Sequence, residues 1–477
     1  MASSVIVIGG GFSGLACATL LAERGVKVTL LEGRQMLGGR AFSYPDPDNG
    51  EVVDNGQHLF MSCYFETIRF LERIGTRDLL HFQPRLKVSF LDASHGKSQL
   101  ACLPLPAPLH LMSGLLGLSH LSFADRFRAR HVWNALKDPV WNETTLDQIT
   151  VEQWLVRLRQ SPRARTQFWD LIAIACLNEE ASRAAALSFA AVLRQAFFGG
   201  PLDSRLGYST VGLSRLYTEA AQRYIESHGG EVRLKTPVER MVIDKNQVRE
   251  ILLRGGDALI AESYVSTLPP QNLVRLFSEN YLNETPYFGN CRKLTNAPII
   301  SVNLWFESPI VSDALIGFLN TQTHWLFNKA SLLKKEKVSP GYVSLVISGA
   351  HAFMSWDKTD ILSLCLEEIR RLVPTSRGVS LKHARVAVEA NATLSPVPGT
   401  QVFRPTTESP LRNLALAGDW VRTGLPATIE SAVLSGHQAA AFLLDEEITE
   451  DPRRMGGVPV RSRVFSMPKQ PAGGLIV

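Results

Sequence analysis

Three glycines stand at the spacing Gly9-x-Gly11-x-x-Gly14 between an apolar run and a helical pattern near the start of the chain. The run Val5–Ile8 predicts a buried parallel strand, and residues 15–24 repeat apolar positions at helical spacing. Gly9 permits a tight turn, Gly11 lets the backbone approach a pyrophosphate, and Gly14 lets the helix pack close to the strand. The turn therefore predicts a dinucleotide-binding βαβ unit with a phosphate at the helix N-terminus.

An acidic residue follows the second strand of this unit. The helix ends at Gly25, the run Lys27–Leu31 predicts a parallel strand, and Glu32 follows that strand 18 residues after Gly14. A carboxylate in this place accepts hydrogen bonds from ribose hydroxyls. Because strand, turn, helix and acid occur together, a chance glycine turn is the weaker interpretation.

A second glycine pair, Gly38-Gly39, precedes Arg40 just beyond Glu32. The two glycines permit another close approach of the backbone, and the Arg40 guanidinium can neutralise a phosphate. The alternative is an ordinary loop that carries a surface arginine.

Near the other end of the chain, an apolar strand at 414–417 leads into Gly418-Asp419, and a helix is expected from about residue 427 to 444. Thr428 and Ile429 lie at the start of that helix. Free N–H groups and a partial positive charge at a helix N-terminus suit the electron-rich pyrimidine edge of a flavin. The alternative is a capped helix with a purely structural role.

Residues 54–58 read Asp54-Asn55-Gly56-Gln57-His58. The first three can form a tight turn. His58 is either a hydrogen-bonded core histidine or a residue beside the cofactor, and Gln57 and His58 are the candidate catalytic residues.

Together these segments resemble the FAD-dependent amine oxidase and phytoene desaturase superfamily, and within it the squalene-associated group of hydroxysqualene dehydroxylases. The resemblance spans about residues 4–445, and residues 54–61, 325–327, 416–420 and 423–430 carry it. One position departs from the family pattern, because Asn328 stands where the family has an acid after Trp325-Leu326-Phe327.

The resemblance implies an α/β fold with a discontinuous Rossmann-like FAD-binding domain and an interleaved helical plus mixed-sheet substrate domain. We expect 1–80, 205–275 and 400–445 in the FAD-binding domain, 81–204 and 276–399 in the substrate, membrane-facing domain, and 449–477 in a disordered tail. It also assigns cofactor-binding roles, with no metal. The pyrophosphate would be held by Gly9, Gly11, Phe12, Ser13 and Gly14, and the phosphate region by Gly39 and Arg40. Glu32 would bind the ribose and Val238 the adenine. Gly418 and Asp419 would bind the ribityl or pyrophosphate side, and Thr428 and Ile429 would bind the flavin.

The implied reaction is the reductive removal of the hydroxyl of hydroxysqualene to give squalene, with upstream squalene-pathway enzymes as possible partners. A carotenoid desaturase would instead take hydride from a polyprenyl hydrocarbon with oxidised FAD. A lipid-binding escort module of the same fold would use no flavin chemistry. An NAD-dependent dehydrogenase leaves Gly39, Arg40 and Asp419 without a role.

The composition limits both the class of protein and the cellular compartment in which it is expected. A hydrophobic content of 45% excludes a mainly disordered chain, and a net charge of +5 on 477 residues does not suit a dedicated nucleic-acid binder. Six cysteines without a C-x-x-C motif favour a reducing compartment. No run of about 18 apolar residues is present. We therefore expect a cytoplasmic protein docked on the inner face of the membrane through Leu103–Phe123 and the basic residues Arg126, Arg128, Arg130 and Lys137.

Overall fold

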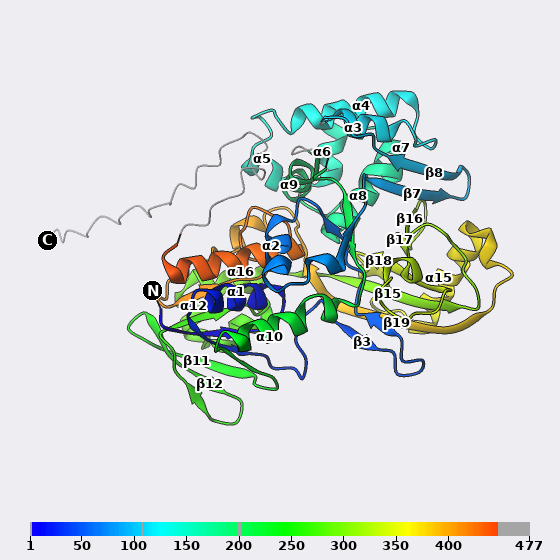
Figure 1. Cartoon of the computed structure of the whole chain (residues 1–477). Coiled ribbons are helices and arrows are strands. Elements are labelled where there is room, and N and C mark those ends of the chain that lie inside the picture. Colours follow the sequence, from blue (N-terminus) through cyan, green and yellow to red (C-terminus); the bar gives the residue numbers. More distant parts are fainter. Residues whose placement is uncertain (1, 107, 198–201, 447–477) are drawn as a thin grey trace.

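The computed structural model describes residues 2–106, 108–197 and 202–446 of the chain. Two sheets lie side by side, and a layer of helices covers one end of the second sheet (Figure 1). The tail predicted to be disordered, residues 449–477, lies outside the described residues. None of the helices in the described ranges combines the length and apolarity that crossing a bilayer requires.

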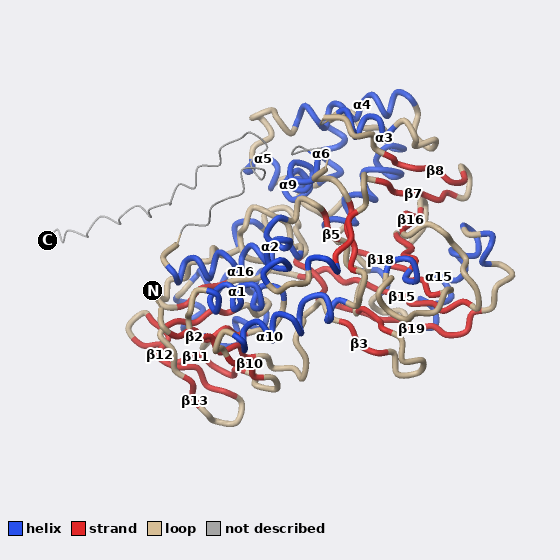
Figure 2. Tube along the Cα trace, in the orientation of Figure 1, coloured by secondary structure: helices blue, strands red, loops and turns tan. Residues whose placement is uncertain are grey.

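A five-stranded parallel sheet forms the centre of the first part. The predicted first strand is central, the predicted second strand beside it follows closely in the chain, and the other three strands come from residues 231–416, which confirms the discontinuous α/β fold. Figure 2 draws the strands in red and the helices beside them in blue. In spatial order the strands are β10 (Glu231–Arg233), β2 (Lys27–Leu31), β1 (Ser4–Ile8), β14 (Ser263–Ser266) and β20 (Leu414–Leu416).

Four helices share one hydrophobic cluster with this sheet. Small residues such as Ala16 and Ala440 let α1 and α16 approach closely, since a Cβ built at Gly436 would lie 2.2 Å from the Ser13 carbonyl oxygen. The helices are α1 (Phe12–Glu23), α2 (Phe65–Arg73), α10 (Glu219–Ser227), which the π-turn η3 (Ser214–Thr218) precedes, and α16 (Ile429–Leu444).

A second cluster includes Ile6 and Leu414 of the parallel sheet and side chains of an antiparallel hairpin sheet. Leu282 and Phe288 join this cluster, so residues 276–294 pack against the parallel sheet, although they were expected in the substrate, membrane-facing domain. The elements are β11 (Val238–Asp244), β12 (Gln247–Leu253), β13 (Ala258–Leu259), α11 (Pro270–Leu273), α12 (Glu279–Glu284) and α13 (Pro286–Gly289).

The second large sheet has seven strands, and each pair of adjacent strands is antiparallel except the pair β16 and β7. Helix α15 (Lys358–Leu372) covers one face through the cluster that contains Ile300, Val302 and Leu304. The strand order is β19 (Leu381–Leu394), β15 (Asn296–Phe306), β18 (Tyr342–Ser348), β17 (Trp325–Asn328), β16 (Leu315–Phe318), β7 (Lys87–Asp92) and β8 (Gly96–Ala101), and α14 (Lys329–Leu332) follows β17.

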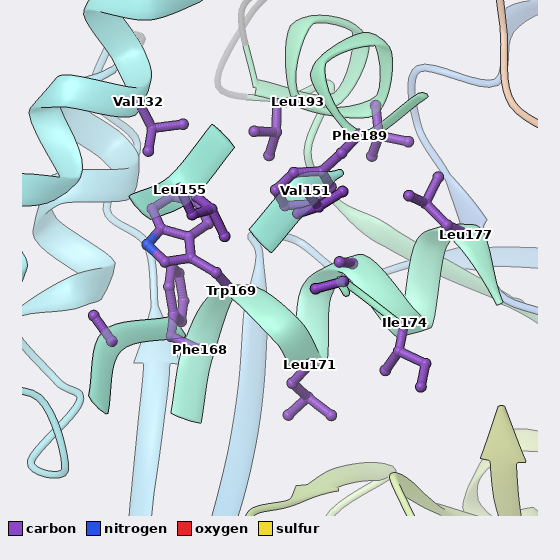
Figure 3. Packing of buried hydrophobic residues seen from close by; sticks show 14 of the residues in the cluster. Val132, Val151, Leu155, Phe168, Trp169, Leu171, Ile174, Leu177, Phe189 and Leu193 are labelled. Carbon is purple, nitrogen blue, oxygen red and sulfur yellow. The ribbon is translucent and has the colours of Figure 1, made fainter. Parts of the chain in front are cut away.

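A helical layer packs on part of the opposite face of this sheet. Its core combines Trp169 and Phe189 with Phe327 and Val346 of the sheet, and Figure 3 shows the helical side of the cluster. The helices are α3 (Leu109–Leu115), α4 (Phe123–Ala135), α5 (Glu143–Asp147), α6 (Val151–Arg157), α7 (Pro162–Ala164), the π-turn η2 (Arg165–Trp169), α8 (Asp170–Leu177) and α9 (Ala186–Phe197).

The expected membrane segment Leu103–Phe123 is only partly at the surface. Leu115, Leu118 and Leu121 are buried in the core of the helical layer, so these three residues of the expected contact are not available to a membrane surface. Leu115 is the last residue of α3, while Leu118 and Leu121 lie in the loop between α3 and α4. Leu109, Leu116 and Phe123 remain exposed.

Short strands connect the two parts of the molecule. The pair β3 (Ser43–Pro45) and β4 (Val52–Asp54) brings Asp54 beside the second sheet, and a small sheet joins β5 (Phe60–Met61), β9 (Leu206–Ser209) and β6 (Leu80–Phe82). Residues 54–58 therefore lie between the parallel sheet and the seven-stranded sheet.

Candidate functional site

In the glycine turn between β1 and α1, packing leaves no room for a side chain at Gly14, but it does leave room at Gly11. A Cβ built at Gly14 would lie 1.9 Å from the Gly9 carbonyl oxygen, which no side chain permits. A Cβ built at Gly11, the N-cap of α1, would meet only the Gly39 Cα, at 3.8 Å. Gly11 is therefore not demanded by the protein's own packing, and it keeps the N-terminus of α1 accessible to a bound group.

The second glycine loop lies directly over this turn. The Gly38 N–H donates to the Gly10 carbonyl oxygen at 2.8 Å, and a Cβ built at Gly39 would lie 3.2 Å from the Gly11 Cα. Two backbone segments thus approach each other closely at the end of α1, as the sequence predicts for a phosphate-binding loop.

Glu32 lies beneath the same turn at the end of β2. Its Oε2 accepts from the Gly10 N–H and its Oε1 from the Arg34 N–H, each at 2.9 Å. The Thr236 N–H donates to the Glu32 carbonyl oxygen at 2.9 Å, which brings the start of β11 at Val238 to this end of the site. Each carboxylate oxygen keeps a further lone pair that a ribose hydroxyl can use.

Phe12 and Ser13 direct their side chains into the protein. The Phe12 ring stacks on Tyr217 with ring centroids 3.7 Å apart, and Ser13 Oγ lies 3.3 Å from Ser435 Oγ on α16. Both residues are buried. Only their backbone N–H groups, in the first turn of α1, are therefore suited to hold a phosphate.

Asp419 and Arg40 join the two ends of the chain at this site. Arg40 Nη2 lies 2.5 Å from Asp419 Oδ1, and Arg40 Nη1 donates to the Ala392 carbonyl oxygen on β19 at 3.0 Å. The Gly418 N–H donates to Ser435 Oγ at 2.8 Å. The glycine loops, the end of β20 and helix α16 are thereby brought together.

Thr428 is the N-cap of α16, with its hydroxyl accepting from the Ser431 N–H at 3.2 Å. Ile429 is the first residue of the helix, whose 16 residues give its N-terminus a partial positive charge. The predicted placement of Thr428 and Ile429 at a helix N-terminus agrees with the structure, while a direct contact with flavin stays a prediction.

Arg404 was missed by sequence reasoning. Its side chain is buried, and its guanidinium donates five hydrogen bonds, four of them to the backbone carbonyls of residues 419, 420, 421 and 425. Burial lowers the pKa of Arg404 to about 10, with Asp419 opposing the shift, so the group stays charged at neutral pH. Arg404 holds the loop that presents Asp419, and no local motif marks it.

Gln57 and His58 meet a buried ion pair that sequence reasoning also missed. Lys329 Nζ lies 2.7 Å from Asp54 Oδ2 and donates to Gln57 Oε1 at 2.8 Å. Burial acts to raise the pKa of Asp54, but the Lys329 charge and hydrogen bonds outweigh it and hold that pKa below its usual value. The available signal was a lysine directly after the apolar strand that ends at Asn328.

The surroundings of His58 favour its neutral form. Burial lowers the pKa of His58, and its Nδ1 lies 2.8 Å from the Gly56 carbonyl oxygen, which can only accept. Nδ1 therefore carries the proton, and Nε2 of the neutral ring is an acceptor. The catalytic roles expected of Gln57 and His58 stay predictions.

Known proteins resemble this chain over most of its length. The family model described as flavin containing amine oxidoreductase matches residues 12–444. The chain is 24% identical to a 15-cis-phytoene desaturase of Solanum lycopersicum over 93% of its length and 78% of that protein. It is 26% identical to a hydroxysqualene dehydroxylase of Sinorhizobium fredii over 94% of its length and 100% of that protein. The crystal structure of an oxidoreductase from Methanosarcina mazei matches with a TM-score of 0.72 at 14% identity, covering 93% of this chain and all of that one.

Proposed function

Because the chain belongs to the family of flavin containing amine oxidoreductases, we propose that it removes the hydroxyl group of hydroxysqualene reductively to give squalene. The chain is an oxidoreductase and its cofactor is FAD. The observation that carries the finer proposal is the match with a hydroxysqualene dehydroxylase over that enzyme's full length.

The residues of the site suit FAD. The space beside Gly11 at the N-terminus of α1 accepts a pyrophosphate, Glu32 has free lone pairs for the ribose, and Arg40 with Asp419 adds a charged pair at the join of the two chain ends. The backbone N–H groups that begin at Ile429 would face the pyrimidine edge. When bound in its reduced form, FAD supplies hydride to a substrate carbon. A non-flavin escort module would need none of these features.

A desaturase is the second candidate, and the similarity to phytoene desaturases over most of the chain favours it. The two reactions run in opposite redox directions. Dehydroxylation takes a hydride, which carries two electrons, from reduced FAD and one further proton, and it releases water and oxidised FAD, whereas desaturation takes a hydride from the hydrocarbon and reduces oxidised FAD. The buried Lys329–Asp54 pair favours dehydroxylation, because an alcohol needs a proton donor to leave as water and a hydrocarbon does not.

The test is an anaerobic incubation of the photoreduced protein with hydroxysqualene, followed by identification of the lipid product. We expect squalene, formed in proportion to the flavin reoxidised. A parallel incubation of the oxidised protein with phytoene should leave both lipid and flavin unchanged. Conversion of phytoene, with hydroxysqualene left intact, would establish the desaturase instead.

We also propose that the helical layer docks on an anionic membrane surface, where a C30 lipid resides. Leu116 and Phe123 are 62% and 77% exposed, directly after α3 and at the start of α4. Both helices lie at the top of the molecule in Figure 1. Basic groups follow at once. Arg130 lies over the Phe127 ring at 3.8 Å, and Lys137 over the Trp133 ring at 4.8 Å. An exposed apolar edge beside basic residues is typical of a peripheral membrane contact.

Replacing both Leu116 and Phe123 with serine should weaken binding to anionic liposomes about tenfold or more, because each side chain loses apolar burial in the lipid. Flotation measures the bound fraction, and flavin content should not change. The matched control is Val402→Ser, at a side chain that is 64% exposed elsewhere on the molecule. Equal flotation of the double variant and the parent protein would show that this edge does not contact the membrane.

A further inference from the structure

One face of the seven-stranded sheet carries polar side chains in an apolar setting. Alternate residues of β15 share a face, and on this face Ile299, Ser301, Asn303 and Trp305 follow one another. The residues between them, Ile300, Val302 and Leu304, pack against α15 on the other side. A strand with both faces covered is expected to be apolar throughout, so Ser301 and Asn303 need an explanation.

Both polar side chains are buried without complete hydrogen bonding. Ser301 and Asn303 are each 2% exposed. Within the described part of the chain, neither Ser301 Oγ nor Asn303 Nδ2 has a hydrogen-bond partner. Native proteins satisfy nearly all such groups, so two of them two residues apart on one face point to a bound molecule with a polar atom.

The strand register places apolar residues next to this pair. Ser301 is opposite Val346 and Asn303 is opposite Ser344, while Trp325 and Phe327 continue the same two rows on β17. Val346, Trp325 and Phe327 belong to the cluster shared with the helical layer. The polar pair therefore borders an apolar region on that side, which suits a molecule that is mostly hydrocarbon.

The Lys329–Asp54 pair lies on the other side of the polar residues. Tyr342 donates to Asn303 Oδ1 at 2.9 Å, and it shares a buried cluster with Val53, the residue before Asp54. A Cβ built at Gly56 would lie 3.9 Å from Ser301 Oγ. Lys329 stands two residues after Phe327, in the direction of Tyr342.

Lys329 keeps donor capacity in this arrangement. An ammonium group donates three hydrogen bonds, and in the described residues Lys329 Nζ has two acceptors, Asp54 and Gln57. Its side chain is 2% exposed, so bulk water does not surround the third N–H. The third donor can thus serve a buried ligand.

From this juxtaposition we propose that Ser301, Asn303 and Lys329 form a binding site for the hydroxyl group of an isoprenoid alcohol, with Lys329 as its proton donor. The inference rests on the proposed function and adds the residues that recognise the alcohol. Asn303 Nδ2 donates a hydrogen bond to the alcohol oxygen, and Ser301 Oγ accepts a hydrogen bond from the alcohol O–H. The C–O bond breaks, the oxygen leaves as water with a proton from Lys329 Nζ, and the carbon takes a hydride from reduced FAD, the two-electron reductant. Lys329 is left neutral and regains its proton afterwards.

The binding test uses the oxidised, FAD-loaded protein, which cannot complete the reduction. Flavin absorbance changes are titrated with hydroxysqualene and with squalene in the same detergent. We expect the parent protein to bind the alcohol at least about tenfold more tightly, because squalene leaves the buried polar groups unmatched. The double variant Ser301→Ala with Asn303→Leu should lose this preference. Asn391→Leu, at an exposed position of β19, should keep it.

The proton-transfer test uses Lys329→Arg, which keeps the charge and the donors but gives up a proton far less readily. We expect alcohol affinity near that of the parent and anaerobic reoxidation of the reduced flavin slowed at least about a hundredfold. The paired variant Asp54→Asn with Lys329→Met avoids a lone buried carboxylate and should also lose reoxidation, with FAD content as the check on folding.

The outcomes separate this site from the reaction. An alcohol preference that survives in the Ser301–Asn303 double variant overturns the binding site, even when the parent protein makes squalene. Parent-like reoxidation in Lys329→Arg overturns the role of Lys329 as proton donor. A preference for the alcohol in a parent protein that makes no squalene supports the binding site and contradicts the proposed function.

Discussion

Replacing Gly11 with valine should give a folded protein that has lost its FAD. Gly11 has φ −84° and ψ −173°, an extended conformation that valine adopts readily. A Cβ there meets only the Gly39 Cα at 3.8 Å, so the protein tolerates it, but the branched side chain fills the space in which the pyrophosphate must lie. We expect the dissociation constant of FAD to rise at least about a hundredfold, which corresponds to about 2.7 kcal/mol.

Flavin absorbance per mole of protein and thermal unfolding of the FAD-free form measure the two effects separately. The FAD-free forms of Gly11→Val and the parent protein should unfold at similar temperatures. Gly14→Val should lose both stability and FAD, because its Cβ would lie 1.9 Å from a backbone oxygen. Gly378→Val, at an exposed position with no atom within 4 Å of the added Cβ, should change neither. Normal flavin content in Gly11→Val would mean that the phosphate lies elsewhere.

The nucleotide-binding half of the site could be predicted from the sequence because its requirements are local. A tight turn, a helix N-terminus and an acid after a strand each occupy a few consecutive residues, so the placement of Gly9–Gly14 before a helix and of Glu32 after a strand could be predicted without knowledge of the fold. The structure adds that Phe12 and Ser13 use their side chains for packing. The spacing of the motif contains no information on side-chain direction.

The residues of the proposed alcohol site could not be predicted in the same way, because they are far apart in the chain. Lys329 and Asp54 are 275 positions apart, and only the placement of β4 beside α14 brings them together. Ser301 and Asn303 look like ordinary polar interruptions until the register shows both faces of β15 to be covered. The leucines of 103–123 illustrate the same limit, since their apolar character does not show which of them the rest of the chain covers.

Arg404 carries the second large expected effect, because it connects the stability of the fold to the cofactor site. All five N–H groups of its guanidinium are used, and four of their acceptors are backbone carbonyls between residues 419 and 425. This loop lies between β20 and α16, so it sets the position of Asp419 and the approach to the helix N-terminus. A neutral residue of similar length cannot replace those donors.

Arg404→Met should lower the free energy of unfolding by about 4 kcal/mol or more, since each of four buried carbonyls that loses its donor costs about 1–3 kcal/mol. It should also weaken FAD binding, because the loop that presents Asp419 is then no longer fixed. Urea unfolding of the FAD-free protein and flavin titration measure the two losses.

Arg412→Met, at an exposed arginine eight positions further along the chain, should alter neither the stability nor the FAD binding. The stability and FAD affinity of Arg404→Lys should lie between those of Arg404→Met and the parent protein, because an ammonium group offers three donors where the arginine uses five. A variant Arg404→Met that is as stable as the parent protein would show that this loop holds its shape through its own backbone, and Asp419 would then owe its position to Arg40 instead.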